Sequence, residues 1–376
     1  MSNRLLSRAA HPHRAPLFSV KCALLAATAI AAPLAYPAFA QSAPGDQATA
    51  PSGGMEEIVV TAERREEKLQ EVPIAVTAFS AKTLQERNIT DLNGLIGLAP
   101  NVKIVQSPGY TTESDVSIRG AITINPAPYW EPVVGIYVDG FYVPKAIGDV
   151  FDMADLDHVE ILRGPQGTLY GRNTIGGAIN IVTRKPSGEF GGYLQVGAGD
   201  YGDVRAQASV DLPAFGKLAI KGSGLIENRD GFVDVQADPY RSPLGLPPSV
   251  GDLYSLDSKA GRIAARLFAT DDVTIDYAFD VSQERNRPNY SQLTRVGAGG
   301  IFDPTSSIYL GIPLYQYIQS SPASRTAYIN GSVNNSPVFE DAGFRAHSLT
   351  VTWDVNDDLT LKSLTGYRWI DWSNSL

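Results

Sequence analysis

Cysteine and histidine are scarce in this chain of 376 residues, which contains one cysteine and four histidines. Cys22 lies in an apolar stretch near the amino terminus, and His158 and His347 are far apart in the sequence. If that stretch belongs to a cleaved leader, the remaining chain has no cysteine, which excludes disulfide bonds and thiolate metal sites. A metal site made of several histidines is nearly excluded as well, because only two histidines remain. We therefore predict neither a metal site nor a bound cofactor.

The motifs of common enzymes and nucleotide-binding proteins are also missing. Gly171 and Gly176 have the spacing of a P-loop, but Gly177 and Ala178 stand where Lys and Ser/Thr are required. The segment AINIVTR that follows predicts a strand instead of a helix. No G-x-S-x-G motif occurs, and the distant histidines form no evident triad. We therefore expect a protein that is not an enzyme. Its glycines are expected to allow tight turns and close backbone packing.

The first forty residues have the pattern of a secretory signal peptide. An apolar run at 22–32 is too short to span a bilayer well, and small residues at 38–40 suit a cleavage site. The basic residues before the apolar run are Arg4, Arg8, Arg14 and Lys21. The net charge is −9, and removal of this basic leader at 1–40 makes the chain more acidic. An exported acidic chain has little reason to bind nucleic acid.

Residues 41–55 are rich in Ala, Pro, Gly, Ser and Gln, which predicts a flexible linker. The β-prone run 58–61 follows it and precedes a charged segment, so the run has no neighbour in sequence to pair with. Such a strand can add to the exposed sheet edge of a partner through main-chain hydrogen bonds. It can equally be the first strand of the next domain, and the residues leave both interpretations open.

Residues 70–185 predict a compact domain of mixed helices and strands. Ser80 caps one expected helix, and Thr90 or Asp91 caps a second that Pro100 ends. The second helix would place Leu92, Leu95, Ile96 and Leu98 on one face. Strands are expected at 116–120, 133–143, 159–164 and 178–184. The dipeptide Asp139-Gly140 between apolar runs indicates a type I′ hairpin.

After Pro186 the apolar residues alternate with polar ones over long segments, as at 273–280 and 348–355. Short turns at 270–272 and 356–358 alternate with long polar loops at about 229–257 and 285–342. This pattern is typical of outer-membrane β-barrels, although exported soluble β proteins share the alternation. The aromatic residues near strand ends, Tyr367, Trp369 and Trp372, fit an interfacial girdle facing outer-membrane lipid, but they also fit any large β protein.

Several motifs together resemble TonB-dependent outer-membrane receptors. The run EEIVVTA at 56–62 resembles the TonB box, and the runs at 117–120, 137–140 and 159–186 resemble the signatures of the plug domain. The resemblance implies an α+β plug domain at 70–185, followed by an antiparallel transmembrane β-barrel whose strands fall in 187–376. It also implies a monomer in the outer membrane of a Gram-negative bacterium, with TonB and its ExbB/ExbD energy complex as partners.

The implied function is energy-coupled uptake of a scarce ligand, with a ferric siderophore or similar iron chelate as the default. Uptake of a carbohydrate or another organic nutrient is the alternative within the family. A passive porin-like channel is the alternative from another class. A porin, however, needs neither a mixed domain ahead of the barrel nor a tethered strand.

The resemblance also assigns residues. The segment expected to contact TonB consists of Glu56, Glu57, Ile58, Val59, Val60, Thr61 and Ala62. The residues expected to be structural in the plug are Arg119, Gly120, Asp139, Gly140, Glu160, Arg163, Gly164, Gly167, Gly171, Gly176 and Gly177. Glu160 is expected near Arg163 in the same strand. If the arginines are buried they should be paired, with acidic groups on the barrel wall as candidate partners; the alternative is that they are exposed, solvated charges. Tyr110, Tyr129 and Trp130, in candidate outward loops at 106–115 and 122–131, are candidates for ligand contacts, and packing of these aromatic side chains on the barrel is at least an equal alternative.

The length of the chain departs from the family pattern. The barrel of this family has about 22 strands and encloses a lumen that the plug fills. At about ten residues a strand plus turns, residues 187–376 supply only roughly seven or eight strands. We therefore expect an incomplete barrel, from a truncated product or a sequence fragment.

Overall fold

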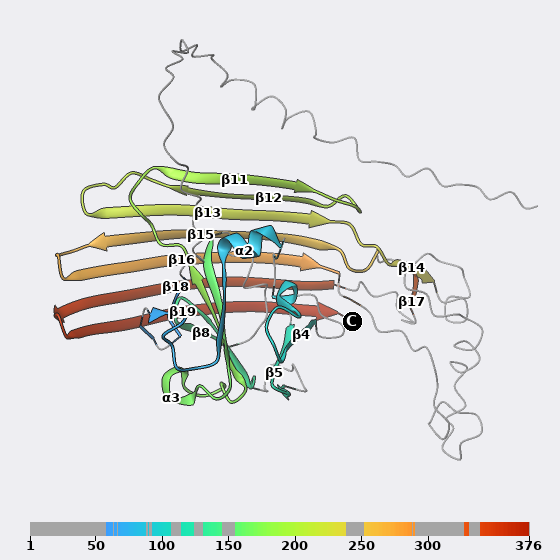
Figure 1. Cartoon of the computed structure of the whole chain (residues 1–376). Coiled ribbons are helices and arrows are strands. Elements are labelled where there is room, and N and C mark those ends of the chain that lie inside the picture. Colours follow the sequence, from blue (N-terminus) through green and yellow to red (C-terminus); the bar gives the residue numbers. More distant parts are fainter. Residues whose placement is uncertain are drawn as a thin grey trace, which may run out of the picture. The chain divides into compact units, whose positions relative to one another are not determined.

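The computed structural model describes residues 58–62, 64–65, 67–87, 89, 92–106, 114–123, 131–144, 155–237, 252–287, 289, 327–330 and 339–375 (Figure 1). The predicted signal peptide and linker, together with Glu56 and Glu57, lie outside these residues. Among the described helices, none is both long and apolar enough to cross a membrane.

The amino-terminal domain, residues 58–183, contains a five-stranded sheet and a three-stranded sheet. In spatial order, the larger sheet consists of β3 (Val76–Ser80), β9 (Leu156–Arg163), β10 (Gly177–Thr183), β7 (Val134–Val138) and β8 (Phe141–Val143). Only β10 and β7 run parallel. The smaller sheet consists of β4 (Val102–Gln106), β5 (Ser114–Ile118) and β6 (Ala121–Ile122). The four strands predicted in this domain are therefore confirmed.

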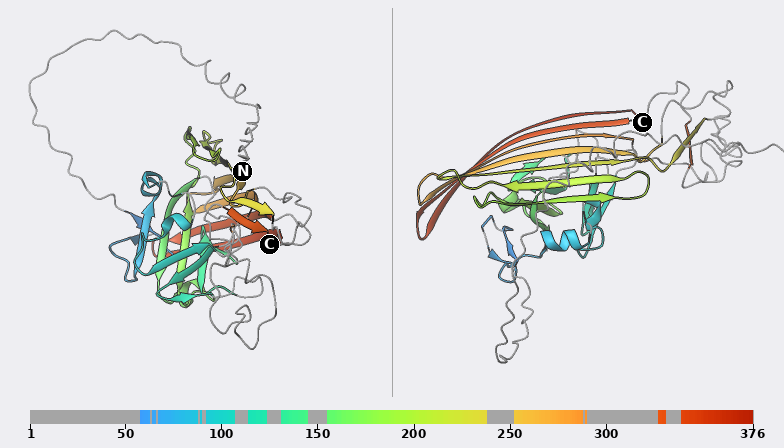
Figure 2. Two further views of the ribbon diagram at one scale, coloured as in Figure 1. Left: turned by 90° about the vertical axis from the view of Figure 1, so that its right-hand side faces the viewer. Right: turned by 90° about the horizontal axis from the view of Figure 1, so that it is seen from above.

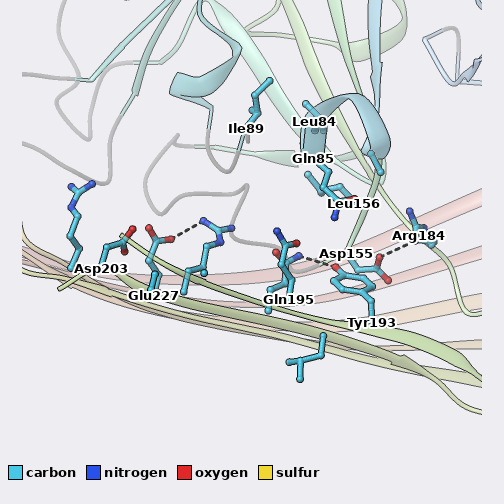
Figure 3. Close-up of a pocket in the computed structure, with 17 residues that line it drawn as sticks. Leu84, Gln85, Ile89, Asp155, Leu156, Arg184, Tyr193, Gln195, Asp203 and Glu227 are labelled. Atoms are coloured by element: carbon cyan, nitrogen blue, oxygen red, sulfur yellow. Dashed lines mark hydrogen bonds and ion pairs between the residues drawn. The ribbon is translucent and has the colours of Figure 1, made fainter. Parts of the chain in front are cut away.

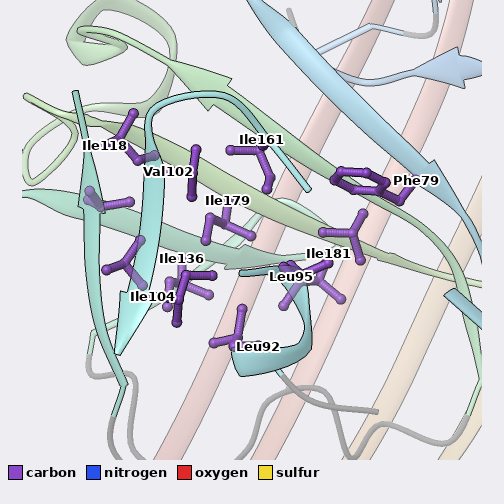
Figure 4. Close-up of a cluster of buried hydrophobic side chains, with 14 of the residues drawn as sticks. Phe79, Leu92, Leu95, Val102, Ile104, Ile118, Ile136, Ile161, Ile179 and Ile181 are labelled. Carbon is purple, nitrogen blue, oxygen red and sulfur yellow. The ribbon is translucent and has the colours of Figure 1, made fainter. Parts of the chain in front are cut away.

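Both sheets contribute to one apolar core (Figure 4). Ile104 and Ile118 come from the smaller sheet, while Ile161 and Ile179 come from the larger one, and all are fully buried. Burying each such side chain contributes about 1.5–3 kcal/mol. This core holds the two sheets of the domain together.

One of the two predicted helices is confirmed. Helix α2 (Ala81–Glu86) begins after Ser80, whose Oγ accepts a hydrogen bond from the Thr83 amide at 3.3 Å. The second prediction is wrong as an α-helix, because only a short 3₁₀ turn, η1 (Asn93–Leu95), forms there. Gly94 and Gly97 explain the difference: glycine disfavours a helix interior, and Gly97 has a φ of +77°. An unpredicted single turn, α3 (Gly167–Tyr170), lies in the glycine-rich run.

Two glycines of this domain are required by its backbone. The Asp139–Gly140 turn joins β7 and β8 with φ angles of +50° and +84°, as a type I′ turn demands, so the predicted hairpin is confirmed. Gly177 has a φ of +151°, and a Cβ there would lie 2.2 Å from the carbonyl oxygen of Leu162. A side chain at position 177 would therefore separate β9 from β10.

The chain after residue 190 forms a seven-stranded antiparallel sheet (Figure 2). Its strands, in both chain and spatial order, are β11 (Gly191–Ala198), β12 (Val204–Asp211), β13 (Leu218–Arg229), β15 (Leu256–Phe268), β16 (Val273–Asn286), β18 (Phe339–Asn356) and β19 (Leu359–Ser375). Within the described residues β11 and β19 do not pair with each other, so the sheet is open. The expected antiparallel strands are confirmed, and their number falls in the expected range.

The two ends of this sheet differ in the length of their connections. The predicted short turns at 270–272 and 356–358 join β15 to β16 and β18 to β19. At the other end, the long connections contain a parallel pair that the sequence did not predict, β14 (Asp234–Ala237) and β17 (Ala327–Asn330).

The two faces of the sheet differ in chemistry, as the alternation predicted. One face exposes large apolar side chains, among them Leu194, Val196, Ile226, Ile263, Tyr277, Val281, Leu349, Trp353, Tyr367 and Trp369. The opposite face buries polar and charged side chains, among them Lys221, Arg262, Asp280 and Glu284. Strands that are apolar outward and polar inward are typical of transmembrane barrels.

Candidate functional site

The segment at residues 58–62, called here the β1 segment, forms a small hairpin with the charged residues that follow it. Strand β1 (Val59–Val60) pairs antiparallel with β2 (Glu67–Lys68). The amide of Leu69 also donates to the carbonyl oxygen of Ile58 at 3.0 Å. The prediction that this strand has no neighbour in sequence to pair with is therefore wrong. The charged segment itself supplies the partner, because the chain reverses at Arg64, whose φ is +64°.

Apolar side chains of the β1 segment pack on the amino-terminal domain. Val60 and Ala62 are fully buried in a cluster with Tyr137, Leu162 and Tyr170. Val59, which points the other way along the strand, is 45% exposed. The segment therefore lies docked on the domain along one of its faces.

Thr61, between the two buried residues, is bound through its polar atoms. Its amide donates to Glu160 Oε1 at 2.5 Å, and its hydroxyl donates to the same oxygen at 3.0 Å. Asn180 donates from Nδ2 to the Thr61 hydroxyl at 2.9 Å and to Glu160 Oε2 at 3.1 Å. Glu160 has no exposed surface, so this carboxylate depends on these donors.

His158 is the charged partner of Glu160. Its Nε2 lies 2.9 Å from Glu160 Oε1 and its Nδ1 lies 2.7 Å from Asp157 Oδ2. Burial alone would lower the pKa of His158, but hydrogen bonds and charge attraction to Asp157 and Glu160 outweigh it and raise this pKa to about 9. The hydrogen bond to His158 in turn lowers the pKa of Asp157. The imidazole is therefore a buried cation at neutral pH.

Glu160 and Arg163 lie in the same strand, β9, as expected, but their side chains do not share a face. Residues three apart in a strand point to opposite faces, whereas His158 and Glu160, two apart, share a face. Arg163 instead donates from Nη1 to the carbonyl oxygen of Pro100 at 3.4 Å, and Arg119 is exposed.

Arg64, which the sequence did not single out, fixes the turn after the β1 segment. Its Nη1 donates to the carbonyl oxygen of Gly140 at 2.8 Å, and its Nε donates to that of Leu169 at 3.3 Å. The guanidinium carbon lies 4.3 Å from the ring centroid of Tyr170 and 5.2 Å from that of Tyr137. An arginine held over aromatic rings in this way gains cation–π attraction as well as hydrogen bonds.

Ion pairs join the amino-terminal domain to the buried face of the large sheet. Arg262 donates from Nη2 to Asp139 Oδ2 at 2.6 Å and from Nη1 to Asp280 Oδ1 at 2.8 Å. Thr183 donates from its amide and its hydroxyl to Asp139 at 2.9 and 2.8 Å. In the Arg262–Asp139 pair the domain supplies the acid and the sheet wall supplies the base, which is the opposite of the polarity expected for Arg119 and Arg163.

A second such contact is centred on Asp155, which is buried. Lys221 of β13 forms an ion pair with it, and Ser209 of β12 donates to Asp155 Oδ2 at 2.9 Å. This contact borders a cleft of about 790 Å³ between the α2 region and strands β11 to β13 (Figure 3). Charged side chains line the cleft, including Arg184 near Asp155 and the pair Arg205–Glu227 at 2.8 Å.

The remaining glycines predicted to be structural lie at the ends of strands or of α3. Gly120 follows β5, Gly167 and Gly171 bracket α3, and the Gly164 amide donates to the carbonyl oxygen of Gly176 at 3.0 Å. The residues assigned to ligand, Tyr110, Tyr129 and Trp130, lie outside the described part of the chain. Among the described residues, no group of three or more His, Cys, Asp or Glu could hold a metal ion.

Comparison with known proteins identifies relatives of this arrangement. Residues 68–178 match the family model of the TonB-dependent Receptor Plug Domain. The pesticin receptor of Yersinia pestis is 30% identical over 232 residues, which are 61% of this chain and 32% of that protein. The vitamin B12 transporter BtuB of Vibrio vulnificus is 28% identical over 179 residues, which are 46% of this chain and 28% of that protein. The chain thus spans about a third of the length of these relatives.

The fold likeness extends beyond the matched domain. The solved structure of the ferric yersiniabactin uptake receptor FyuA from Yersinia pestis resembles 80% of this chain with a TM-score of 0.57, at 23% sequence identity and over 41% of the FyuA chain. This share is larger than the range 68–178, so the likeness extends beyond the residues that match the family model. Residues 68–178 therefore match the plug domain of TonB-dependent receptors, and the chain has the fold of part of the FyuA structure.

Proposed function

We propose that this chain acts in TonB-dependent uptake across the outer membrane of a Gram-negative bacterium. The observation that carries the proposal is the docked β1 segment on a plug that is itself ion-paired to the polar face of an antiparallel sheet. The proposed division of the chain is a signal peptide at 1–40, a linker at 41–55, a TonB box at 56–62, a plug at 70–185 and barrel strands within 187–376.

The apolar face of the sheet supports a position in lipid. Large apolar side chains are exposed along that face over most of the seven strands, with Tyr367 and Trp369 among them. A soluble protein rarely leaves so extended an apolar surface uncovered. In the complete receptor we expect further strands to close the sheet into a barrel, because open sheet edges are not tolerated in lipid.

Residues 56–62 are the proposed contact with TonB. An extended segment that adds to a partner sheet forms several main-chain hydrogen bonds side by side, which suits a mechanical grip. No ATP is available in the periplasm, so the work must come through TonB from its ExbB/ExbD complex. Because Thr61 is bound to Glu160 in this structure, the segment must leave the plug before TonB can take all of it.

The proposed ligand is a ferric siderophore or a similar iron chelate. FyuA is described as a ferric yersiniabactin uptake receptor, and another relative, from Pseudomonas aeruginosa, as a ferripyoverdine receptor. BtuB, described as a vitamin B12 transporter, keeps uptake of another organic nutrient open. Passive porin-like conduction is disfavoured because the plug occupies the polar face of the sheet. We propose no enzymatic activity, no cofactor and a monomeric receptor.

Deletion of residues 56–62 tests the proposal in cells that express the gene. We expect loss of energy-dependent uptake of iron chelates, while binding of the chelate to whole cells and the amount of receptor in the outer membrane stay unchanged. Equal loss of uptake and binding, at normal receptor levels, would contradict the proposal. Uptake that persists without TonB would support the porin interpretation instead.

A further inference from the structure

The hairpin of β1 and β2 is held on the plug at two separate polar points. At the first, Glu160 of β9 accepts hydrogen bonds from the amide and hydroxyl of Thr61. At the second, Arg64 donates to the carbonyl oxygens of Gly140 and Leu169 and lies over the ring of Tyr170. The first point lies within the segment proposed for TonB, and the second lies just after it.

The first point is built so that it can open. A carboxylate buried without a partner would be strongly destabilising, and loss of both Thr61 donors removes part of its support. His158 and Asn180, however, also bind Glu160 and belong to the plug strands β9 and β10. They remain in place when the β1 segment departs. The buried charge therefore keeps a cationic partner in both states, and undocking at this point costs little more than the hydrogen bonds made by Thr61.

The second point depends on the geometry of an arginine. The guanidinium satisfies two carbonyl oxygens in different elements and also stacks near two tyrosine rings. A lysine ammonium at the same place has the charge but lacks the planar fork that reaches both oxygens. Gly140, one of the two acceptors, lies next to Asp139, which Arg262 holds on the sheet wall. The hairpin is thus tied to the turn that is also fixed to the sheet.

We infer that Glu160 and Arg64 are positioning residues that form a two-point latch, which keeps the β1 segment docked until it is taken by a partner strand. With both points made, Val60 and Ala62 are fully buried. The inference deepens the proposed function, on which it relies only for the identity of the partner. The latch itself can be tested without TonB and without ligand.

Thiol labelling at position 60 measures undocking. The single cysteine, Cys22, lies in the predicted leader, so a Val60→Cys receptor purified from the outer membrane presents one reactive thiol. This side chain is fully buried while the segment is docked. We expect slow labelling in the parent background and faster labelling with Glu160→Gln or Arg64→Lys. The expected increase is about tenfold or more, which corresponds to losing one hydrogen bond to a charged group.

Matched substitutions and a core probe separate undocking from unfolding. Glu86→Gln and Arg65→Lys change exposed residues of the same types and are expected to leave the labelling rate unchanged. A cysteine at Ile104, buried in the main core, should stay unreactive in every background. Fast labelling of Val60→Cys in the parent, or unchanged rates in both latch variants, would overturn the latch. Faster labelling of Ile104→Cys in the latch variants would also overturn the latch, because it would show that the whole domain unfolds. If the labelling rates support the latch but deletion of 56–62 leaves uptake intact, only the proposed function is contradicted.

Discussion

Thr61 and Glu160 are 99 residues apart in the sequence, yet the amide of Thr61 donates to the Glu160 carboxylate at 2.5 Å. This contact joins the segment that resembles a TonB box to a fully buried acid in the plug. The segment is therefore bound to the plug in this structure, because the amide and the hydroxyl of Thr61 both donate hydrogen bonds to Glu160.

The charge on His158 can be measured directly. Its pKa of about 9 means that the imidazole stays protonated between Asp157 and Glu160 across the neutral range. Because the chain has only four histidines, isotope labelling of histidine and an NMR pH titration can resolve this residue, with His158→Gln to assign it. Titration of its signal near pH 6.5, the value for an unperturbed histidine, would contradict the buried ion pair.

The same charge predicts how stability depends on pH. The folded-state pKa of His158 lies above its unfolded value near 6.5, so its contribution is fully present below about pH 6.5 and is lost as the pH rises through about 9. We expect the midpoint of thermal unfolding to fall over this interval in the parent chain, and to fall less in His158→Gln. Parallel curves for the two proteins would refute the assignment.

Arg262 is expected to be a main link between plug and sheet. Arg262→Met leaves the buried Asp280 and the half-buried Asp139 without their cation, and we expect a loss of about 3–5 kcal/mol in stability. Arg285→Met is the matched control, since Arg285 pairs with Asp341 at an exposed position of the same sheet and should cost less than about 1 kcal/mol. The stability loss of each variant can be measured by denaturant unfolding, with limited proteolysis of the plug as the readout. Similar losses in the two variants would argue against the link.

Gly177 is expected to tolerate no side chain. Gly177→Ala places a Cβ against the carbonyl oxygen of Leu162 and strains a backbone with positive φ, so we expect a loss of about 2–4 kcal/mol. Gly167→Ala is the comparison, because a Cβ there meets no atom within 4 Å. The two variants can be compared by the temperature at which they unfold. A Gly177→Ala protein as stable as Gly167→Ala would show that β9 and β10 are less tightly paired than described.

The apolar face of the sheet should reject charge if it faces lipid. Ile263 lies on this face within β15 and is 58% exposed, so Ile263→Arg is expected to cost about 2–4 kcal/mol of insertion free energy and to lower the amount of receptor in the outer membrane. Asp271→Arg, in the short turn after β15, should have no such effect. Membrane fractionation with quantitative blotting compares the two. Equal membrane levels would contradict a lipid-facing sheet.

Local patterns predicted much of this fold. Alternation over 273–280 and 348–355 predicted strands with one apolar face, and Asp139-Gly140 predicted its hairpin, because both signals depend on residues close in sequence. The second helix failed for a local reason as well. The apolar spacing of Leu92 and Leu95 predicts a helix, but Gly94 and Gly97 limit the helical structure to a single 3₁₀ turn.

The contacts of the candidate site were beyond such patterns. Nothing near Glu160 in the sequence indicates that it binds Thr61, and Asn180 reaches the same threonine from 119 residues away. Arg64 lies in a charged segment whose sequence indicates no particular contact, and only the folded plug places Gly140 and Tyr170 around it. A weak signal was available for β2: strand β1 required a partner, and the nearest segment that could reverse onto it was the charged one.

Binding of the periplasmic domain of TonB to the purified receptor tests the central claim most directly. The account predicts measurable affinity for the parent chain, loss of binding when residues 56–62 are deleted, and tighter binding for Glu160→Gln, whose segment is released from the plug. Affinity that is the same for the parent chain, the deletion and Glu160→Gln would contradict the claim that the docked β1 segment is what TonB takes.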